Sequence, residues 1–126
     1  MRIMVVEDEE LLIQVIGRKL TKMGFEVISF TSAHQALDYL GNFGELPDAI
    51  WLDYYLGDMN GLDFMNALKK NPNWSKIPVF VVSNSASDEK KRSMLALGVK
   101  DYFLKAKYRL DEIADAIKKS VGEGKL

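Results

Sequence analysis

Five polar residues stand at or just beyond the ends of apolar runs that have the length and composition of β-strands. They are Glu7 and Asp8 after residues 2–6, Asp53 at the end of residues 49–53, Ser83 at the end of residues 77–83, and Lys105 at the end of residues 100–105. Burying a carboxylate costs free energy unless a partner compensates its charge. Three acids, a hydroxyl and an ammonium group would form a chemical site if the fold brought them together.

The residue types in this set favour phosphoryl chemistry. Clustered carboxylates need a cation, and hard oxygen ligands suit Mg²⁺, or Mn²⁺, with water and phosphate oxygens as the remaining ligands. Lys105 can hold a phosphoryl oxygen, and Ser83 can donate a hydrogen bond to another. A carboxylate can attack phosphorus to form an aspartyl phosphate, a reaction that mostly needs positioning and charge neutralisation. Asp53 is the preferred nucleophile because it stands on the central, third strand.

The elements that must position these residues alternate regularly along the chain. Residues 2–6, 25–30, 49–53, 77–83 and 100–105 are predicted strands, and the segments that follow each of them have helical spacing of apolar residues. Such alternation predicts parallel pairing in a doubly wound sheet with helices on both sides. Parallel strands place their carboxyl ends on one rim, where the ligand crevice of an open α/β sheet lies. The five polar residues should therefore meet at this rim.

Length and composition limit the alternatives. The 126 residues are expected to form one domain, residues 1–126, with a frayed tail at 121–126. The net charge of -1 argues against direct binding of nucleic acid or of an anionic membrane. There is no cysteine, no signal peptide is expected, and no apolar segment approaches the length of a membrane span. A cytoplasmic location fits these features.

Four motifs, in this order, resemble those of the receiver domain of a two-component response regulator, of the chemotaxis-type single-domain kind. They are the acids in "VVEDEE", Asp53 in "LDYYLGDMNG", Ser83 in "VFVVSNS" and Lys105 in "DYFLKA". The likeness covers essentially the full length. It implies a flavodoxin-like (β/α)5 three-layer sandwich with a five-stranded parallel sheet of order 2-1-3-4-5.

The resemblance also implies how the site works. Asp53 would accept a phosphoryl group from a histidine kinase or a histidine phosphotransfer protein, with Lys105 and Ser83 holding the phosphoryl oxygens. Mg²⁺ would bind to Asp8, Asp53, Glu7 and the backbone carbonyl of Tyr55. The protein would phosphorylate and dephosphorylate itself as a switch and would not be a turnover enzyme.

The output is likewise an expectation from the family. Ser83 would move toward the phosphate and open room for Tyr102, and the face formed by the fourth helix, fifth strand and fifth helix would change. That face would signal to a downstream protein or to an output domain outside this sequence.

Several positions depart from the family pattern. Ala106 stands where proline is common after the lysine, so the Lys105–Ala106 bond is left open between cis and trans. Asn84 replaces a small residue, and Tyr55 and Ser85 occupy positions linked to the rate of dephosphorylation. We expect Tyr55 and Asn84 together to change the lifetime of the phosphate.

Two other functions use similar features. A small haloacid-dehalogenase-like phosphatase also uses a strand-end aspartate, but it needs a second acid two residues later, where this chain has Tyr55. A flavin carrier needs a phosphate-binding loop after the first strand, which "EDEE" would repel. Asp58 is expected to be a solvated loop acid and His34, the only histidine, a surface residue.

Overall fold

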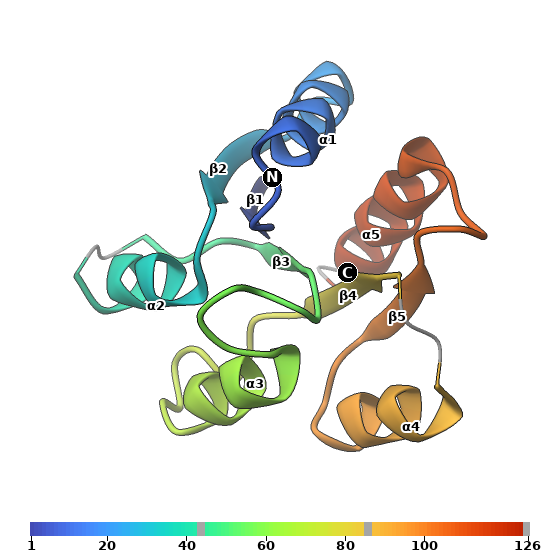
Figure 1. Cartoon of the computed structure of the whole chain (residues 1–126). Helices are drawn as coiled ribbons and strands as arrows, with labels where there is room; N and C mark the ends of the chain where they lie inside the picture. Colours follow the sequence, from blue (N-terminus) through green and yellow to red (C-terminus); the bar gives the residue numbers. More distant parts are fainter. Residues whose placement is uncertain (43–44, 85–86, 125–126) are drawn as a thin grey trace.

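The strands of the protein form as their apolar runs predict, and a helix follows each one. The computed structural model describes residues 1–42, 45–84 and 87–124 (Figure 1). Its elements are β1 (Arg2–Val6), α1 (Glu10–Lys22), β2 (Glu26–Phe30), α2 (Ala33–Asn42), β3 (Ala49–Leu52), α3 (Gly61–Lys69), β4 (Val79–Ser83), α4 (Asp88–Ala96), β5 (Asp101–Leu104) and α5 (Leu110–Gly124).

All five strands pair in parallel in the order β2-β1-β3-β4-β5, which confirms the predicted topology. The chain runs from β1 outward to β2 and then returns to the other side of β1 as β3. The strand order therefore reverses between β1 and β3, and a crevice forms at such a point beyond the carboxyl ends of the strands. Val6, the last residue of β1, pairs with Leu52, the last residue of β3, so the residues that follow both strands start side by side.

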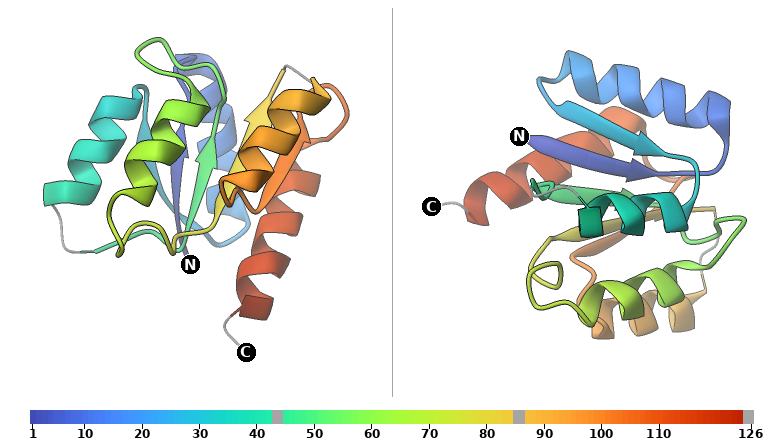
Figure 2. Two further views of the ribbon diagram at one scale, coloured as in Figure 1. Left: turned by 90° about the horizontal axis from the view of Figure 1, so that it is seen from below. Right: turned by 90° about the vertical axis from the view of Figure 1, so that its left-hand side faces the viewer.

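Helices cover both faces of the sheet, which makes three layers (Figures 1 and 2). One apolar core lies between the sheet and α2, α3 and α4, and the other lies between the sheet and α1 and α5. Successive β1 residues alternate between the two cores, with Met4 in the first and Val5 in the second, because side chains of a strand point to opposite faces. Burial on both faces explains why β3 is apolar throughout and β4 is apolar up to its last residue, Ser83.

Local signals fix most helix ends where the sequence predicts them. Ser32 Oγ accepts a hydrogen bond from the Gln35 amide at 3.2 Å, so this pair caps the start of α2. Gly24 and Gly98 follow α1 and α4 with φ of 93° and 98°, in the left-handed region that favours glycine.

The end of the chain, residues 121–126, was expected to fray, and helix α5 extends into this segment. Helix α5 runs to Gly124, and Val121 is buried. Val121 continues the stripe of Ile113 and Ile117 at four-residue spacing, and all three pack in the core below α5. Residues 125 and 126 lie outside the described part of the chain.

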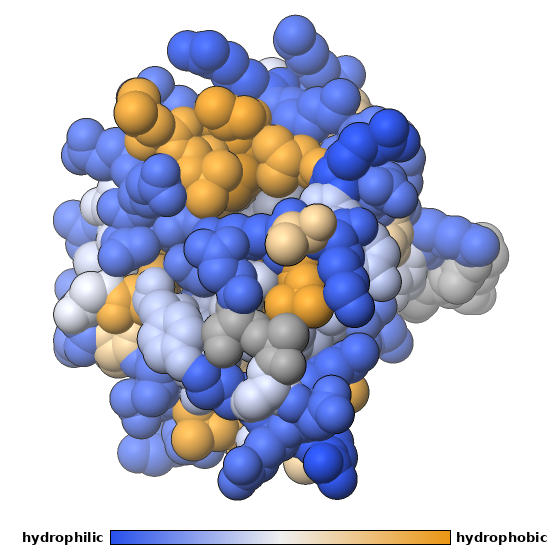
Figure 3. All heavy atoms as spheres, turned by 45° about the vertical axis from the view of Figure 1, so that its right-hand side comes forward, coloured by the Kyte–Doolittle hydropathy of each residue, from blue (hydrophilic) through white to orange (hydrophobic). Residues whose placement is uncertain are grey.

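The surface is largely polar, with an apolar patch in the upper part of Figure 3, at the height of α1. Leu11 and Val15 of α1 are among the exposed large apolar residues. Within the described residues, no helix combines the length and apolar character needed to cross a bilayer.

Candidate functional site

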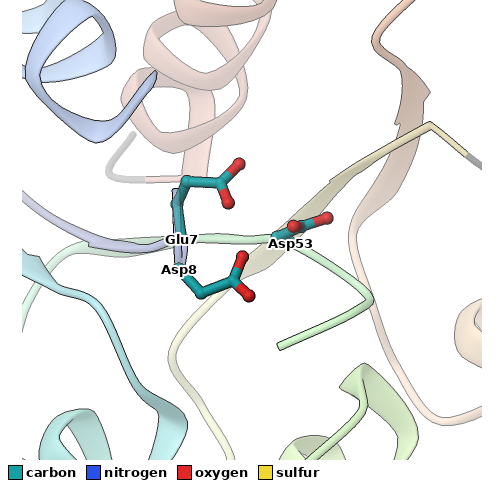
Figure 4. Close-up of side chains that lie close together, drawn as sticks. All are labelled: Glu7, Asp8 and Asp53. Carbon is teal, nitrogen blue, oxygen red and sulfur yellow. The ribbon is translucent and has the colours of Figure 1, made fainter. Parts of the chain in front are cut away.

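Three carboxylates meet beyond the ends of β1 and β3, as the sequence predicts. One oxygen from each of Glu7, Asp8 and Asp53 lies within 4.8 Å of the others. The carboxylates of Glu7 and Asp8 point to the same side of the end of β1, towards Asp53 (Figure 4). The Asp53 amide donates to the Val6 carbonyl at 3.0 Å, which ties the two strand ends together.

These carboxylates differ in how far they are removed from water. Glu7 is 1% exposed and Asp53 is 8% exposed, whereas Asp8 is exposed. Two buried acids side by side require compensation, since an unpaired buried charge is strongly destabilising.

Lys105 supplies part of that compensation from the end of β5. Its Nζ donates a hydrogen bond to Glu7 Oε1 at 2.7 Å and lies 3.7 Å from Asp53 Oδ2. Its amide donates to the Ser83 carbonyl at 2.9 Å, which holds this backbone against the end of β4. The Lys105–Ala106 peptide bond, left open from the sequence, is trans, like every other peptide bond of the described residues.

The electrostatics of the site favour a bound cation. Burial, the Glu7 carboxylate and to a lesser degree Asp8 raise the pKa of Asp53 to about 7, against the opposing effect of Lys105. Burial and Glu7 also raise the pKa of Asp8. Burial raises the pKa of Glu7 as well, but the hydrogen bonds and charge of its neighbours, chiefly Lys105, outweigh burial and lower it. One ammonium group thus does not neutralise three carboxylates.

The donor set fits a hard divalent cation. Three converging carboxylates, of which Asp8 is open to solvent, match the preference of Mg²⁺ or Mn²⁺ for oxygen ligands with water in the remaining positions. The raised pKa values of Asp53 and Asp8 point the same way, because a cation would favour their charged forms.

Ser83 and Tyr102 form the side of the site toward β5. Ser83 is fully buried at the end of β4, and Tyr102 is 5% exposed. Burial raises the pKa of the Tyr102 phenol, while a hydrogen bond between its side chain and Ser83 lowers it. Tyr102 therefore lies buried on the β5 side of the site.

Two of the residues expected to tune the lifetime of a phosphate are open to solvent. Tyr55 is 50% exposed and Asn84 is exposed. Ser85 lies outside the described residues. The ring of Tyr55 meets the ring of Tyr54 in a T-shaped contact with centroids 4.9 Å apart.

Asp58 lies exposed in the loop after β3, as the sequence predicts, but its carboxylate also binds the start of α2. Its carboxylate accepts hydrogen bonds from the amides of Ala33 at 3.1 Å and His34 at 2.8 Å, and its Oδ2 lies 2.5 Å from His34 Nδ1. Asp58 therefore caps the start of α2 from the loop after β3. Burial raises its pKa, but the hydrogen bonds, mainly from the amides of His34 and Ala33, lower it to about 2. His34 is exposed at the surface, as predicted.

Sequence reasoning also missed Lys90 of α4, whose ammonium group lies over the rings of Tyr54 and Tyr55. Nothing in the spacing of a lysine within a charged helix distinguishes it from its neighbours, so no local signal could have found it.

Known proteins resemble the chain in both sequence and structure. The family model for the response regulator receiver domain matches residues 3–118. Two-component response regulator ORR8 of Oryza sativa subsp. indica is 32% identical over 103 residues, which are 82% of this chain and 84% of the rice protein. The phosphate regulon transcriptional regulatory protein PhoB of Rhizobium meliloti is 30% identical over 104 residues, which are 82% of this chain and 45% of PhoB.

Solved structures with the same fold cover almost the whole chain. The receiver domain of the Francisella response regulator 1452 superposes with a TM-score of 0.87 at 22% identity, over 98% of both chains. The phosphorylated cyanobacterial phytochrome response regulator RcpA gives a TM-score of 0.81 at 27% identity, over 94% of this chain and 91% of that one.

Proposed function

This chain belongs to the response regulator receiver domain family, and we propose that it is a phosphorylation switch that accepts a phosphoryl group on Asp53. The observation that carries the proposal is the meeting of Asp53 with two further acids and Lys105 at the strand ends. No other described group combines a buried strand-end carboxylate with such neighbours.

In the proposed reaction, an oxygen of the Asp53 carboxylate bonds to phosphorus as the bond from phosphorus to the donor breaks. The donor is a phosphohistidine of a kinase or phosphotransfer protein, and its imidazole leaves. Lys105, already 3.7 Å from Asp53 Oδ2, stabilises the added negative charge. Ser83 donates a hydrogen bond to a second phosphoryl oxygen. The later attack of water releases phosphate and restores the carboxylate.

Asp8, Asp53 and Glu7 would hold Mg²⁺, or Mn²⁺, together with the backbone carbonyl of Tyr55. When bound, the metal supplies positive charge that offsets the carboxylates and the phosphoryl oxygens. Glu7 has a longer side chain than the aspartate common at this place and is engaged by Lys105, so it would act through a bound water.

The signal would leave through Ser83 and Tyr102. Phosphorylation would draw the Ser83 hydroxyl away from Tyr102 and toward the phosphoryl group, which changes the packing of the Tyr102 ring between α4 and β5. The face of α4, β5 and α5 would then change its affinity for a target. The target would be a downstream protein, or an output domain beyond this sequence, as the 45% coverage of PhoB suggests.

The lifetime of the phosphate would depend on Tyr55, Asn84 and Ser85. Asn84 is larger than the residue that is common at its position in the family, and Tyr55 carries an aromatic ring. Both side chains would slow the approach of water to the phosphoryl group. The phosphatase alternative is not supported, because Tyr55 cannot act as the general acid which that mechanism needs two residues after the nucleophile.

The proposal is tested by incubating the protein with acetyl phosphate and Mg²⁺ and weighing it intact. We expect the wild-type protein to gain the mass of one phosphoryl group, and Asp53→Asn to gain none. An adduct of equal yield in Asp53→Asn would refute the assignment of the nucleophile.

A further inference from the structure

Lys90, in the first turn of α4, contacts two tyrosines on the segment that leaves β3. Its Nζ lies 4.4 Å from the centroid of the Tyr55 ring and 5.1 Å from that of Tyr54. Both distances fall within the range of about 6 Å over which an ammonium group is attracted to the face of an aromatic ring. The cation therefore bridges α4 and the segment that leaves β3.

The two tyrosines differ in how they are held. Tyr54 is 8% exposed, and a Cβ added at Gly61 would come within 3.2 Å of its ring and 3.1 Å of Met94 Cε, so the ring is packed tightly between α3 and α4. Tyr55 is half-exposed, and its described ring contacts are with Tyr54 and Lys90. The position of Tyr55 thus depends on Lys90 much more than that of Tyr54 does.

The topology places this contact between the chain segments that leave β3 and β4. β3 and β4 are adjacent in the sheet, with Leu52 paired to Val81. Asp53 directly follows β3, and Ser83 is the last residue of β4. The tyrosines follow β3 and Lys90 follows β4, so their contact joins the two chain segments that flank Asp53.

Among the described residues, α4 buries little side-chain surface that would fix its position. Met94 is its only fully buried side chain among the nine described residues of the helix. Met94 is four residues after Lys90 and so shares its face, and it packs near Tyr54 over Gly61. Lys90 extends this packed face outward to Tyr55.

We propose that Lys90 is a positioning residue that holds the Tyr55 ring over the α4 side of the site and thereby slows hydrolysis of the phosphoryl group on Asp53. The inference rests on the proposed function, because it concerns the lifetime of that phosphate. Lys90 acts indirectly, through Tyr55, because its ammonium group contacts the tyrosine rings.

The experiment compares the loss of phosphate from Asp53 in the wild-type protein and five variants, each phosphorylated with acetyl phosphate and then separated from this reagent. Lys90→Gln removes the charge and keeps much of the length, and Lys90→Arg keeps a cation that can stack on the ring. Lys91→Gln is the matched control, because it removes the neighbouring charge from the same helix without touching the contact with the tyrosines. Intact mass is followed over time, and thermal unfolding checks that each variant is folded.

We expect Lys90→Gln to lose phosphate about twofold to fivefold faster, which corresponds to roughly 0.5 to 1 kcal/mol at an exposed cation–aromatic contact. Lys90→Arg and Lys91→Gln should decay within about twofold of the wild-type protein. In a Tyr55→Leu background, which lacks the ring, Lys90→Gln should have no further effect. Rescue by arginine and this lack of additivity would not follow from a merely structural role.

Each outcome decides the inference. An unchanged or slower decay in Lys90→Gln overturns it, as does an equal acceleration in the presence and absence of the Tyr55 ring. If the wild-type protein takes up no phosphoryl group, the proposed function fails and this inference fails with it. If Asp53 takes up a phosphoryl group but the lifetime of that group is the same with and without Lys90, only the role of Lys90 is overturned.

Discussion

Lys105 Nζ donates a hydrogen bond to Glu7 Oε1 at 2.7 Å, whereas it lies 3.7 Å from Oδ2 of Asp53, the proposed phosphoryl acceptor. The single ammonium group therefore satisfies the more deeply buried of the two acids. Asp53 is left with burial and the negative charge of Glu7 as the main influences on its pKa, which is raised to about 7. The site thus carries more negative than positive charge, which a bound cation would offset. This excess of negative charge should affect the stability of the fold in a measurable way.

The first prediction is that Asp53→Asn stabilises the metal-free protein at neutral pH. The folded pKa of about 7 lies above the unfolded value near 3.9. Between these two pH values the folded protein binds a proton that the unfolded chain has lost, so stability falls as the pH rises from about 4 to about 7. Asparagine removes this loss, and we expect a gain of about 1 to 3 kcal/mol in the free energy of unfolding at pH 8.

Urea denaturation at pH 4 and pH 8, without divalent metal, measures this effect. The difference between Asp53→Asn and the wild-type protein should shrink toward zero at pH 4. Asp38→Asn, which changes an exposed acid of α2, is the control and should show no such pH dependence. A constant difference at both pH values would contradict the raised pKa.

The second prediction concerns metal. Mg²⁺ should raise the midpoint of thermal unfolding of the wild-type protein in a concentration-dependent manner, because a ligand that binds only the folded state stabilises it. The gain is about 2.7 kcal/mol when free Mg²⁺ is 100 times its dissociation constant. Asp8→Asn should abolish most of this response, since Asp8 is the solvent-facing member of the cluster.

Asp63→Asn serves as the matched control for the metal experiment. Asp63 is an exposed acid in the first turn of α3, outside the cluster. Its variant should respond to Mg²⁺ as the wild-type protein does. Equal responses in Asp8→Asn and Asp63→Asn would show that Mg²⁺ does not bind at the three carboxylates.

The third prediction is that Asp58 stabilises the fold by capping α2. Asp58→Ala leaves the amides of Ala33 and His34 without their acceptor and should cost about 1 to 2 kcal/mol at pH 7. Because the folded pKa of about 2 lies below the unfolded value, this contribution is present above pH 4 and is lost as the pH falls toward 2. Chemical denaturation at pH 7 and pH 3 provides the measurement.

Asp58→Asn separates the cap from its charge. Asparagine is also a good capping residue, so this variant should keep most of the stability at pH 7 and depend less on pH. If alanine and asparagine destabilise equally, the hydrogen bonds to α2 do not carry the effect.

The sequence predicts the fold and the meeting of the three carboxylates, for a definite reason. Each of Glu7, Asp53 and Lys105 is located by the end of an apolar run, and parallel pairing places all strand ends on one rim. Residue type and strand position are both local properties, so they can be read without coordinates.

Contacts between side chains of different loops could not be predicted in this way. Asp58 accepts hydrogen bonds from Ala33 and His34, which precede it by 25 and 24 positions in the sequence. Lys90 contacts two tyrosines on the segment that leaves a neighbouring strand. Likewise, the position of Lys105 Nζ, 2.7 Å from Glu7 Oε1 and 3.7 Å from Asp53 Oδ2, is set by side-chain placement between strand ends far apart in sequence. The glycines at 122 and 124 suggested an early end to the last helix, whereas α5 runs to Gly124 and its apolar stripe reaches Val121.

Locating the phosphoryl group on the chain tests the proposed function most directly. After incubation with acetyl phosphate and Mg²⁺, borohydride reduces an acyl phosphate to an alcohol, and mass spectrometry of the resulting peptides identifies the modified residue. We predict one modified residue, Asp53, with no modification when Mg²⁺ is withheld or chelated. Modification at another acid, such as Asp8 or Asp58, or an unmodified Asp53 in protein that has gained a phosphoryl group, would contradict the assignment.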